Sequence, residues 1–195
     1  MNEPVKAPLS PEARAKGRRT LLLLAAVAIA PVVASYSAYY FFPREQRTNY
    51  GELLATAPAP ALAGTQMDGR PFALAQLHGK WALLVIAPGA CDATCVQVLH
   101  ATRQARTIQG REMERVQRVW LVTDNGAPDP ALLAQHPDLL AARVSRGALA
   151  GLPAGTDRIY LVDPLGNLVL AFPLEPDIKR TAKDLERLLR ASRIG

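Results

Sequence analysis

The only two cysteines of this 195-residue chain, Cys91 and Cys95, stand four positions apart just behind a strongly apolar run. The run, residues 81–87, is typical of a buried strand, and the residues after the pair predict a helix. Asp92 or Thr94 can cap this helix, because a short side-chain oxygen accepts a hydrogen bond from a free N–H of the first turn. The partial positive charge of a helix N-terminus favours the thiolate form of a nearby cysteine. The pair can therefore exchange disulfides or bind a soft metal ion.

The same two cysteines can also form a plain structural disulfide, or be two small buried side chains. Two features favour a reactive pair. The spacing is that of two residues that work together, and the junction of a strand with a helix is where α/β folds place their chemistry. We therefore interpret Cys91 and Cys95 as redox-active or metal-binding residues.

The elements around the pair predict a single α/β domain. A turn at residues 68–69 joins two short β segments, and a helix over 93–109 separates two long apolar strands, 81–87 and 118–123. Four further elements are expected: a short helix near residue 132, a weak strand over 140–144, an antiparallel hairpin over 158–172 and a last helix that starts at Pro176. This order, with a parallel core and an antiparallel edge, is that of a thioredoxin-like fold.

An uncharged segment of 22 residues, 21–42, precedes this domain. As a helix it is about 33 Å long, enough to cross a hydrocarbon core of about 30 Å. Lys16, Arg18 and Arg19 stand directly before it, so the positive-inside rule predicts a cytoplasmic N-terminus. A cleaved signal peptide is the alternative, but its apolar region would be shorter and would end in a better cleavage site of small residues.

We accordingly predict four parts of the chain: a cytoplasmic tail over 1–19, a transmembrane helix in lipid over 20–43, a linker over 44–60 and a thioredoxin-like domain over 61–195. The net charge of +6 gives little support for a nucleic-acid partner, because residues 1–19 hold five Lys or Arg against two Glu and so supply half of it. Beyond the membrane the cysteines lie where a disulfide can persist.

The chain resembles the SCO/SenC family over about residues 50–192. The segments that carry the resemblance are Gly79–Trp81, the Cys-x-x-x-Cys segment 91–95, the strand end Leu121–Asp124 and Ile159–Gly166. The cysteine spacing matters most, because ordinary thioredoxin-like reductases use Cys-x-x-Cys. Members of this family are membrane-anchored thioredoxin-fold proteins that help to install copper in the CuA site of cytochrome c oxidase. The resemblance implies that Cys91 and Cys95 are both catalytic thiols and copper ligands.

The sequence departs from the family at the third copper ligand. Family members add a histidine eight residues before the aspartate that corresponds to Asp163, but Gly155 stands there and residues 151–157 contain no histidine. Asp92 replaces the family's usual proline after the first cysteine. None of the three histidines of the chain is a convincing substitute, and we expect all of them at the surface: His78, His100 and His136.

Two thiolates alone can hold Cu(I), which is soft, whereas Cu(II) would require a nitrogen ligand. We therefore predict an SCO-like thiol–disulfide oxidoreductase and Cu(I) carrier of the bacterial inner membrane or an equivalent membrane, with its folded domain in the periplasm. Its expected partner is the cytochrome c oxidase subunit with the CuA cysteines. Cys91 would attack a target disulfide and Cys95 would resolve the mixed disulfide.

The alternative is a non-catalytic thioredoxin-fold module in respiratory-complex assembly, with a structural Cys91–Cys95 disulfide. A peroxiredoxin-like peroxidase is less supported, because the residues before Cys91 lack a Thr-x-x-Cys arrangement.

Overall fold

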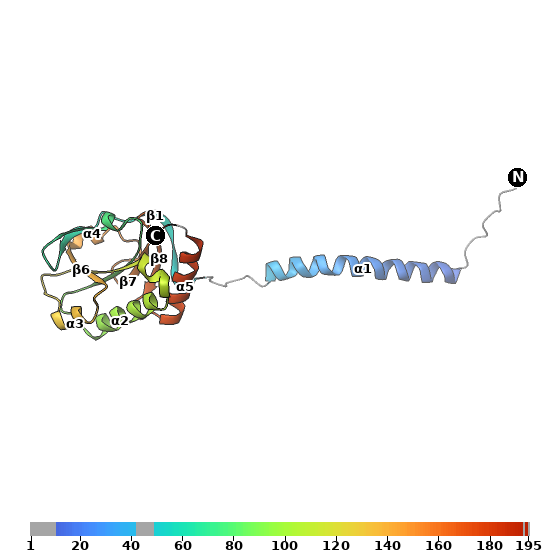
Figure 1. Cartoon of the computed structure of the whole chain (residues 1–195). Coiled ribbons are helices and arrows are strands. Elements are labelled where there is room, and N and C mark those ends of the chain that lie inside the picture. The colour runs from blue at the N-terminus through green and yellow to red at the C-terminus, as the bar shows by residue number, and fades with distance from the viewer. Residues whose placement is uncertain (1–10, 42–48, 193, 195) are drawn as a thin grey trace. The chain divides into compact units, whose positions relative to one another are not determined.

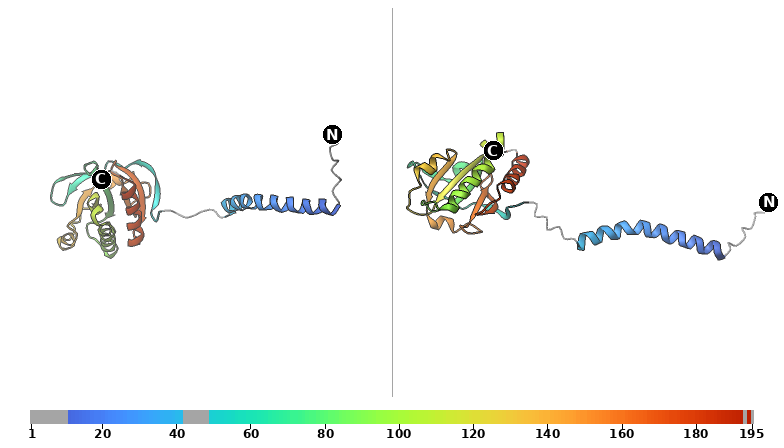
Figure 2. Two further views of the ribbon diagram at one scale, coloured as in Figure 1. Left: turned by 45° about the vertical axis from the view of Figure 1, so that its right-hand side comes forward. Right: turned by 90° about the horizontal axis from the view of Figure 1, so that it is seen from below.

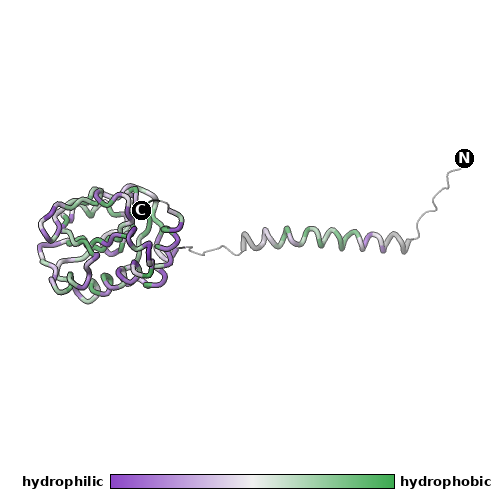
Figure 3. Tube along the Cα trace, viewed as in Figure 1, coloured by the Kyte–Doolittle hydropathy of each residue, from purple (hydrophilic) through white to green (hydrophobic). Residues whose placement is uncertain are grey.

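The computed structural model describes residues 11–41, 49–192 and 194, which belong to two compact units, 1–47 and 48–195 (Figure 1). The first unit contains helix α1 (Pro11–Phe41), which continues through Pro31. Among the described residues, one helical stretch, Lys16–Ser37, is long and apolar enough to cross a membrane, with a mean hydropathy of 2.0. Figure 3 shows the hydrophobic residues along the middle of α1.

Residues 11–19 of the predicted cytoplasmic tail are helical and continue into the apolar segment. Alanine, arginine and lysine, which dominate this stretch, are good helix formers, so a helix that is already nucleated in the apolar segment extends back through them. Residues 1–10 of the predicted tail and 42–48, at the junction of the predicted anchor and linker, lie outside the described residues.

In the described residues, the second unit is built on one sheet of eight strands. The strands are β1 (Glu52–Pro58), β2 (Ala63–Gln66), β3 (Pro71–Ala73), β4 (Trp81–Ala87), β5 (Val116–Val122), β6 (Leu139–Val144), β7 (Arg158–Val162) and β8 (Asn167–Pro173). Their order across the sheet is β1-β8-β7-β4-β5-β6-β2-β3. β4, β5 and β6 are parallel, and the other paired strands are antiparallel. The thioredoxin-like arrangement predicted from the sequence, a parallel core with an antiparallel edge, is therefore confirmed, and β2 and β3 add a second antiparallel edge.

Two layers of side chains cover the two faces of the sheet. Alternate residues of each strand point to opposite faces, so in β4 Leu83 and Val85 enter one core cluster while Leu84 and Ile86 enter the other. Helices α2 (Ala93–Thr107) and α5 (Ile178–Ala191) contact each other and pack on the first face, as Figure 2 also shows. The other face is covered by the 3-10 helix Leu74–Leu77, by α4 (Arg146–Leu149) and by loop residues. The remaining elements are α3 (Pro130–Ala134) and the 3-10 helix Gly110–Arg115.

The predicted linker over 44–60 is wrong for the residues in β1, since this strand pairs with β8 and belongs to the folded unit. The start of β1 is fixed by Asp184 on α5, a buried carboxylate that accepts hydrogen bonds from Tyr50 N at 2.7 Å and from Gly51 N at 2.9 Å. Helix α5 begins two residues later than predicted, because Asp177 is its N-cap. The Asp177 side chain accepts a hydrogen bond from Arg180 N at 2.8 Å.

Candidate functional site

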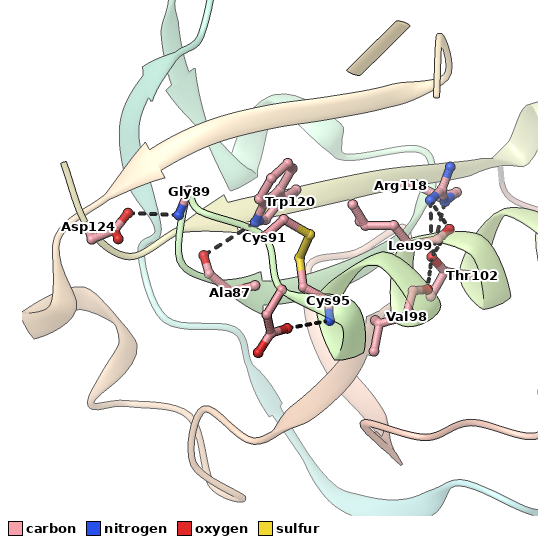
Figure 4. The surroundings of a disulfide bond; sticks show 11 residues. Ala87, Gly89, Cys91, Cys95, Val98, Leu99, Thr102, Arg118, Trp120 and Asp124 are labelled. Atoms are coloured by element: carbon pink, nitrogen blue, oxygen red, sulfur yellow. Dashed lines mark hydrogen bonds between the residues drawn. A yellow bond between two sulfur atoms is a disulfide. The ribbon is translucent and has the colours of Figure 1, made fainter. Parts of the chain in front are cut away.

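The predicted pair of cysteines forms a disulfide where β4 passes into α2 (Figure 4). The Cα atoms of Cys91 and Cys95 are 5.3 Å apart. Cys91 lies in the loop before the helix and is half-buried, whereas Cys95 lies in the first turn and is only 5% exposed. A reagent from solvent therefore reaches Cys91 more readily than Cys95.

The first turn of α2 is held by Asp92, one of the two capping residues that the sequence offered. Its Oδ1 atom accepts a hydrogen bond from Cys95 N at 2.8 Å, so the residue between the two cysteines closes the N-terminus of the helix that carries the second one. Thr94 is the second residue of α2 and is exposed. The cap fixes the backbone of Cys95 directly.

The inner side of the disulfide faces the core. Cys95 belongs to the cluster under α2, and Cys91 packs against that cluster. Figure 4 shows the ring of Trp120 beside Cys91, and this fully buried ring donates a hydrogen bond from Nε1 to the Ala87 carbonyl at 3.3 Å. Because one side of the bridge is apolar and packed, a molecule from solvent can approach its sulfurs only on the outer side of Cys91.

The loop after β5 lies against the loop that carries Cys91. Asp124 follows β5, and its Oδ1 atom accepts hydrogen bonds from Gly89 N at 2.8 Å and from Gly126 N at 3.1 Å. Gly89 lies two residues before Cys91. The only sequence signal was that Asp124 ends the strand next to the cysteines, since the carboxyl ends of parallel strands share one edge of a sheet.

The three histidines are not gathered at the disulfide. His78 is exposed at the end of the 3-10 helix Leu74–Leu77, and His100 is exposed on α2, as predicted. His136 was expected at the surface, but it is only 5% exposed, and its Nδ1 atom is buried without a hydrogen-bond partner. Burial lowers the pKa of His136. The prediction failed because a histidine in a short loop carries no local signal of its depth.

The loop that would carry the family's histidine is closed by a tyrosine. The Tyr160 hydroxyl donates to the Gly155 carbonyl at 2.7 Å and accepts from Ala154 N at 3.0 Å. Burial raises the pKa of Tyr160, so its hydroxyl stays protonated and able to donate. Gly155 has a φ of 74°, in the left-handed region that favours glycine over histidine. Among the residues that the structure describes, no three His, Cys, Asp or Glu side chains are placed to hold a metal ion together.

The fold of the second unit is that of a thioredoxin-like protein. In the sequence this unit is preceded by a helix that is long and apolar enough to cross a membrane. The family model described as "Transmembrane-like, thioredoxin-like, C-terminal domain" matches residues 81–192, and the chain belongs to this family. The model of the corresponding N-terminal domain, also described as transmembrane-like, matches residues 11–41. No curated protein matches the sequence.

Solved structures of similar fold include Sco proteins. Arabidopsis thaliana ScoI with copper bound has a TM-score of 0.58 and 16% identity, over 70% of this chain and 100% of that one. Apo Sco1 from Thermus thermophilus has a TM-score of 0.53 and 22% identity, over 75% and 98%. The thioredoxin domain of a thiol-disulfide oxidoreductase from Bacteroides vulgatus has a TM-score of 0.51 and 19% identity, over 70% and 99%. The resemblance to SCO/SenC proteins is confirmed at the level of the fold.

Proposed function

We propose that the protein is a membrane-anchored thiol–disulfide oxidoreductase that reduces the disulfide of a client protein. The observation that carries this proposal is the asymmetry of the pair: Cys91 is half-buried before the helix, and Cys95 is buried in its first turn. A partly exposed sulfur close to a helix N-terminus is suited to attack, and a buried neighbour is suited to resolve the product. The solved thiol-disulfide oxidoreductase of similar fold supports this assignment.

The reaction starts from the reduced pair. The Cys91 thiolate attacks one sulfur of the client disulfide, that bond breaks, and the second client sulfur leaves as a thiolate that takes up a proton. The Cys95 thiolate, after loss of its own proton, then attacks the Cys91 sulfur and displaces the first client sulfur. Two electrons pass from the cysteine pair to the client, and the disulfide observed here is the oxidised product. A dithiol reductant of the same compartment must restore the two thiols.

We further propose that the reduced pair carries Cu(I) as cargo to the CuA cysteines of a cytochrome c oxidase subunit. Three of the structures with this fold are Sco proteins with copper bound, from Bradyrhizobium japonicum, Arabidopsis thaliana and yeast. Two thiolates fit Cu(I), which accepts soft sulfur ligands. They do not fit Cu(II), because a nitrogen donor is lacking at Gly155 and His100 lies on the exposed side of α2. Both roles require the pair in its reduced state.

The basic residues before the apolar part of α1 set the orientation that we propose. Lys16, Arg18 and Arg19 would remain in the cytoplasm under the positive-inside rule, which places the folded domain in the periplasm of a bacterium. In this compartment both a client disulfide and an oxidised Cys91–Cys95 pair can exist.

The test of the exchange reaction is a trapping experiment with the full chain in detergent. Cys95→Ser should accumulate a mixed disulfide with a disulfide-bonded client peptide, whereas the matched variant Cys91→Ser should accumulate far less, because its remaining sulfur is buried. Equal trapping by the two variants would remove the assigned order of attack. A midpoint potential below about −300 mV for the unaltered chain would instead indicate a structural disulfide.

The copper role is tested separately, by titrating the reduced full chain with Cu(I) against a chelator of known affinity. One Cu(I) per chain is expected, and either serine variant should abolish it. If the exchange reaction is observed and Cu(I) is not retained, the carrier role is withdrawn. In cells, a strain with both cysteines replaced by serine should contain less CuA, and normal CuA content would count against the proposed client.

A further inference from the structure

A carboxylate from the neighbouring strand fixes the loop that carries Cys91. Asp124 stands just beyond β5. One of its carboxylate oxygens, Oδ1, accepts hydrogen bonds from two backbone N–H groups, that of Gly89 in the cysteine loop and that of Gly126 in its own loop. Figure 4 shows Asp124 and Gly89 facing each other on the side of the loop away from α2. Two loops that are separated by more than thirty residues in the sequence thus share one acceptor.

The two loops also touch through their backbones. A Cβ atom on Gly89 would lie only 2.3 Å from the Gly126 carbonyl oxygen, which no side chain can tolerate without a shift of the backbone. Glycine therefore lets the cysteine loop lie directly on the loop after β5. This contact keeps Gly89 N within reach of the Asp124 carboxylate.

Strand β6 holds the loop after β5 in place. From β6, the Arg143 guanidinium donates through Nε to the Asp124 carbonyl and through Nη2 to the Gly126 carbonyl, both at 2.9 Å. On the other side of the contact, Cys91 N donates to the Gly89 carbonyl at 2.9 Å. Hydrogen bonds thus run from β6 through the loop after β5 and through Gly89 to the backbone of the half-buried Cys91.

We propose that Asp124 is the positioning residue for the Cys91 sulfur, an inference that rests on the proposed exchange function. In the oxidised protein the disulfide itself restrains the cysteine loop. In the reduced protein that restraint is gone, and the bonds to Asp124 hold Cys91 beside Cys95. Asp124 therefore raises the effective concentration of one thiol at the other and makes the disulfide harder to reduce.

The test is the midpoint potential of the Cys91–Cys95 couple, measured with the full chain in detergent against defined thiol buffers. Asp124→Ala removes the shared acceptor and should lower the effective concentration of the thiols about tenfold, which raises the midpoint potential by about 30 mV. Asp124→Asn keeps a side-chain oxygen that can accept from the same two N–H groups, so it should restore a potential close to that of the unaltered chain.

A matched control exists at another turn of the sheet. Asp163 in the β7–β8 turn also accepts two backbone N–H bonds with Oδ1, from Leu165 at 2.9 Å and from Asn167 at 2.8 Å. Asp163→Ala should reduce stability without moving the potential. If Asp124→Ala does not fold, Arg143→Gln is the second variant. It removes the hydrogen bonds from Arg143 to the loop after β5 and should also raise the midpoint potential.

Each outcome decides a different claim. A potential that is unchanged in Asp124→Ala, or that shifts equally in Asp163→Ala, overturns the positioning role, even when the unaltered chain exchanges disulfides normally. Failure of the asparagine variant to restore the potential also counts against it. Failure of the unaltered chain to exchange with thiol buffers rejects the proposed function itself.

Discussion

Replacement of Arg118 by methionine is expected to destabilise the folded unit strongly, because this guanidinium is fully buried under α2. It donates to the Leu99 carbonyl at 2.5 Å and to Thr102 Oγ1 at 3.1 Å, and it pairs with Asp138 at 3.1 Å. These contacts, drawn in part in Figure 4, clamp the middle of the cysteine-bearing helix to β5. Breaking a buried ion pair from one side typically costs about 3–5 kcal/mol.

The lower end of that range applies here. The Asp138 side chain is 19% exposed, and Arg106 stays 3.6 Å away from it, so the carboxylate is not left wholly uncompensated. A loss of about 3 kcal/mol corresponds to about 6–12 °C in Tm for a unit of this size. The assay is urea unfolding of the full chain in detergent, followed by near-ultraviolet circular dichroism. Both tryptophans, Trp81 and Trp120, are buried in the folded unit, so the long-wavelength part of the signal, to which tyrosine does not contribute, reports on that unit alone.

Arg106→Met is the matched control, because Arg106 pairs with the same carboxylate from a more exposed position. Arg106→Met removes this looser pair and the hydrogen bond from Nε to the Val116 carbonyl, and it should cost about 1–2 kcal/mol, less than Arg118→Met. The reasoning fails if Arg118→Met unfolds within about 1 kcal/mol of the unaltered chain, or if the two arginine variants are equally destabilised. Replacing Arg118 and Asp138 together by apolar residues should recover part of the loss, because neither charge is then left buried alone.

Two further predictions concern other buried polar groups. Burial lowers the pKa of His136, so as the pH falls below the ordinary value of 6.5 the unfolded chain takes up a proton there that the folded unit does not. The free energy of unfolding should therefore fall between pH 7.5 and pH 5.5, and His136→Leu should flatten this dependence where His100→Leu does not; an unchanged slope would contradict the assignment. Asp184→Ala leaves the N–H groups of residues 50–51 without their acceptor and should cost about 2 kcal/mol while opening this segment to proteases. Glu186→Ala, on the exposed side of the same helix, should do neither, and equal sensitivity of the two variants would refute the role of the buried carboxylate.

The sequence predicted the parts of the fold that repeat a local pattern. Strands β4 and β5 are continuous apolar runs because the parallel centre of the sheet is buried on both faces, and such runs are visible without knowledge of their neighbours. The β7–β8 hairpin was predicted because two apolar runs flank a turn. The position of the cysteines followed from the same signals, since a strand and a helix had to meet beside them.

The elements that escaped prediction are held by partners far away in the sequence. Strand β1 reads as an alanine- and proline-rich linker, and its place in the sheet depends on β8 and on Asp184, which lies more than 130 residues further along the chain. The burial of His136 depends on how its loop packs, and the role of Asp124 depends on which loop approaches it. A one-dimensional pattern contains no record of these contacts.

The proposed exchange and carrier roles depend on the same equilibrium, because a Cys91–Cys95 disulfide can neither attack a client nor bind Cu(I) through two thiolates. A residue that raises the midpoint potential of the pair increases the fraction of reduced thiols that can bind Cu(I), but it weakens the pair as a reductant of a client disulfide. The loop at Gly155 is held by Tyr160 rather than by a metal ligand, so it supplies no donor that would keep copper bound when the thiols oxidise. We therefore expect retention of Cu(I) to follow the reduced fraction of the pair closely.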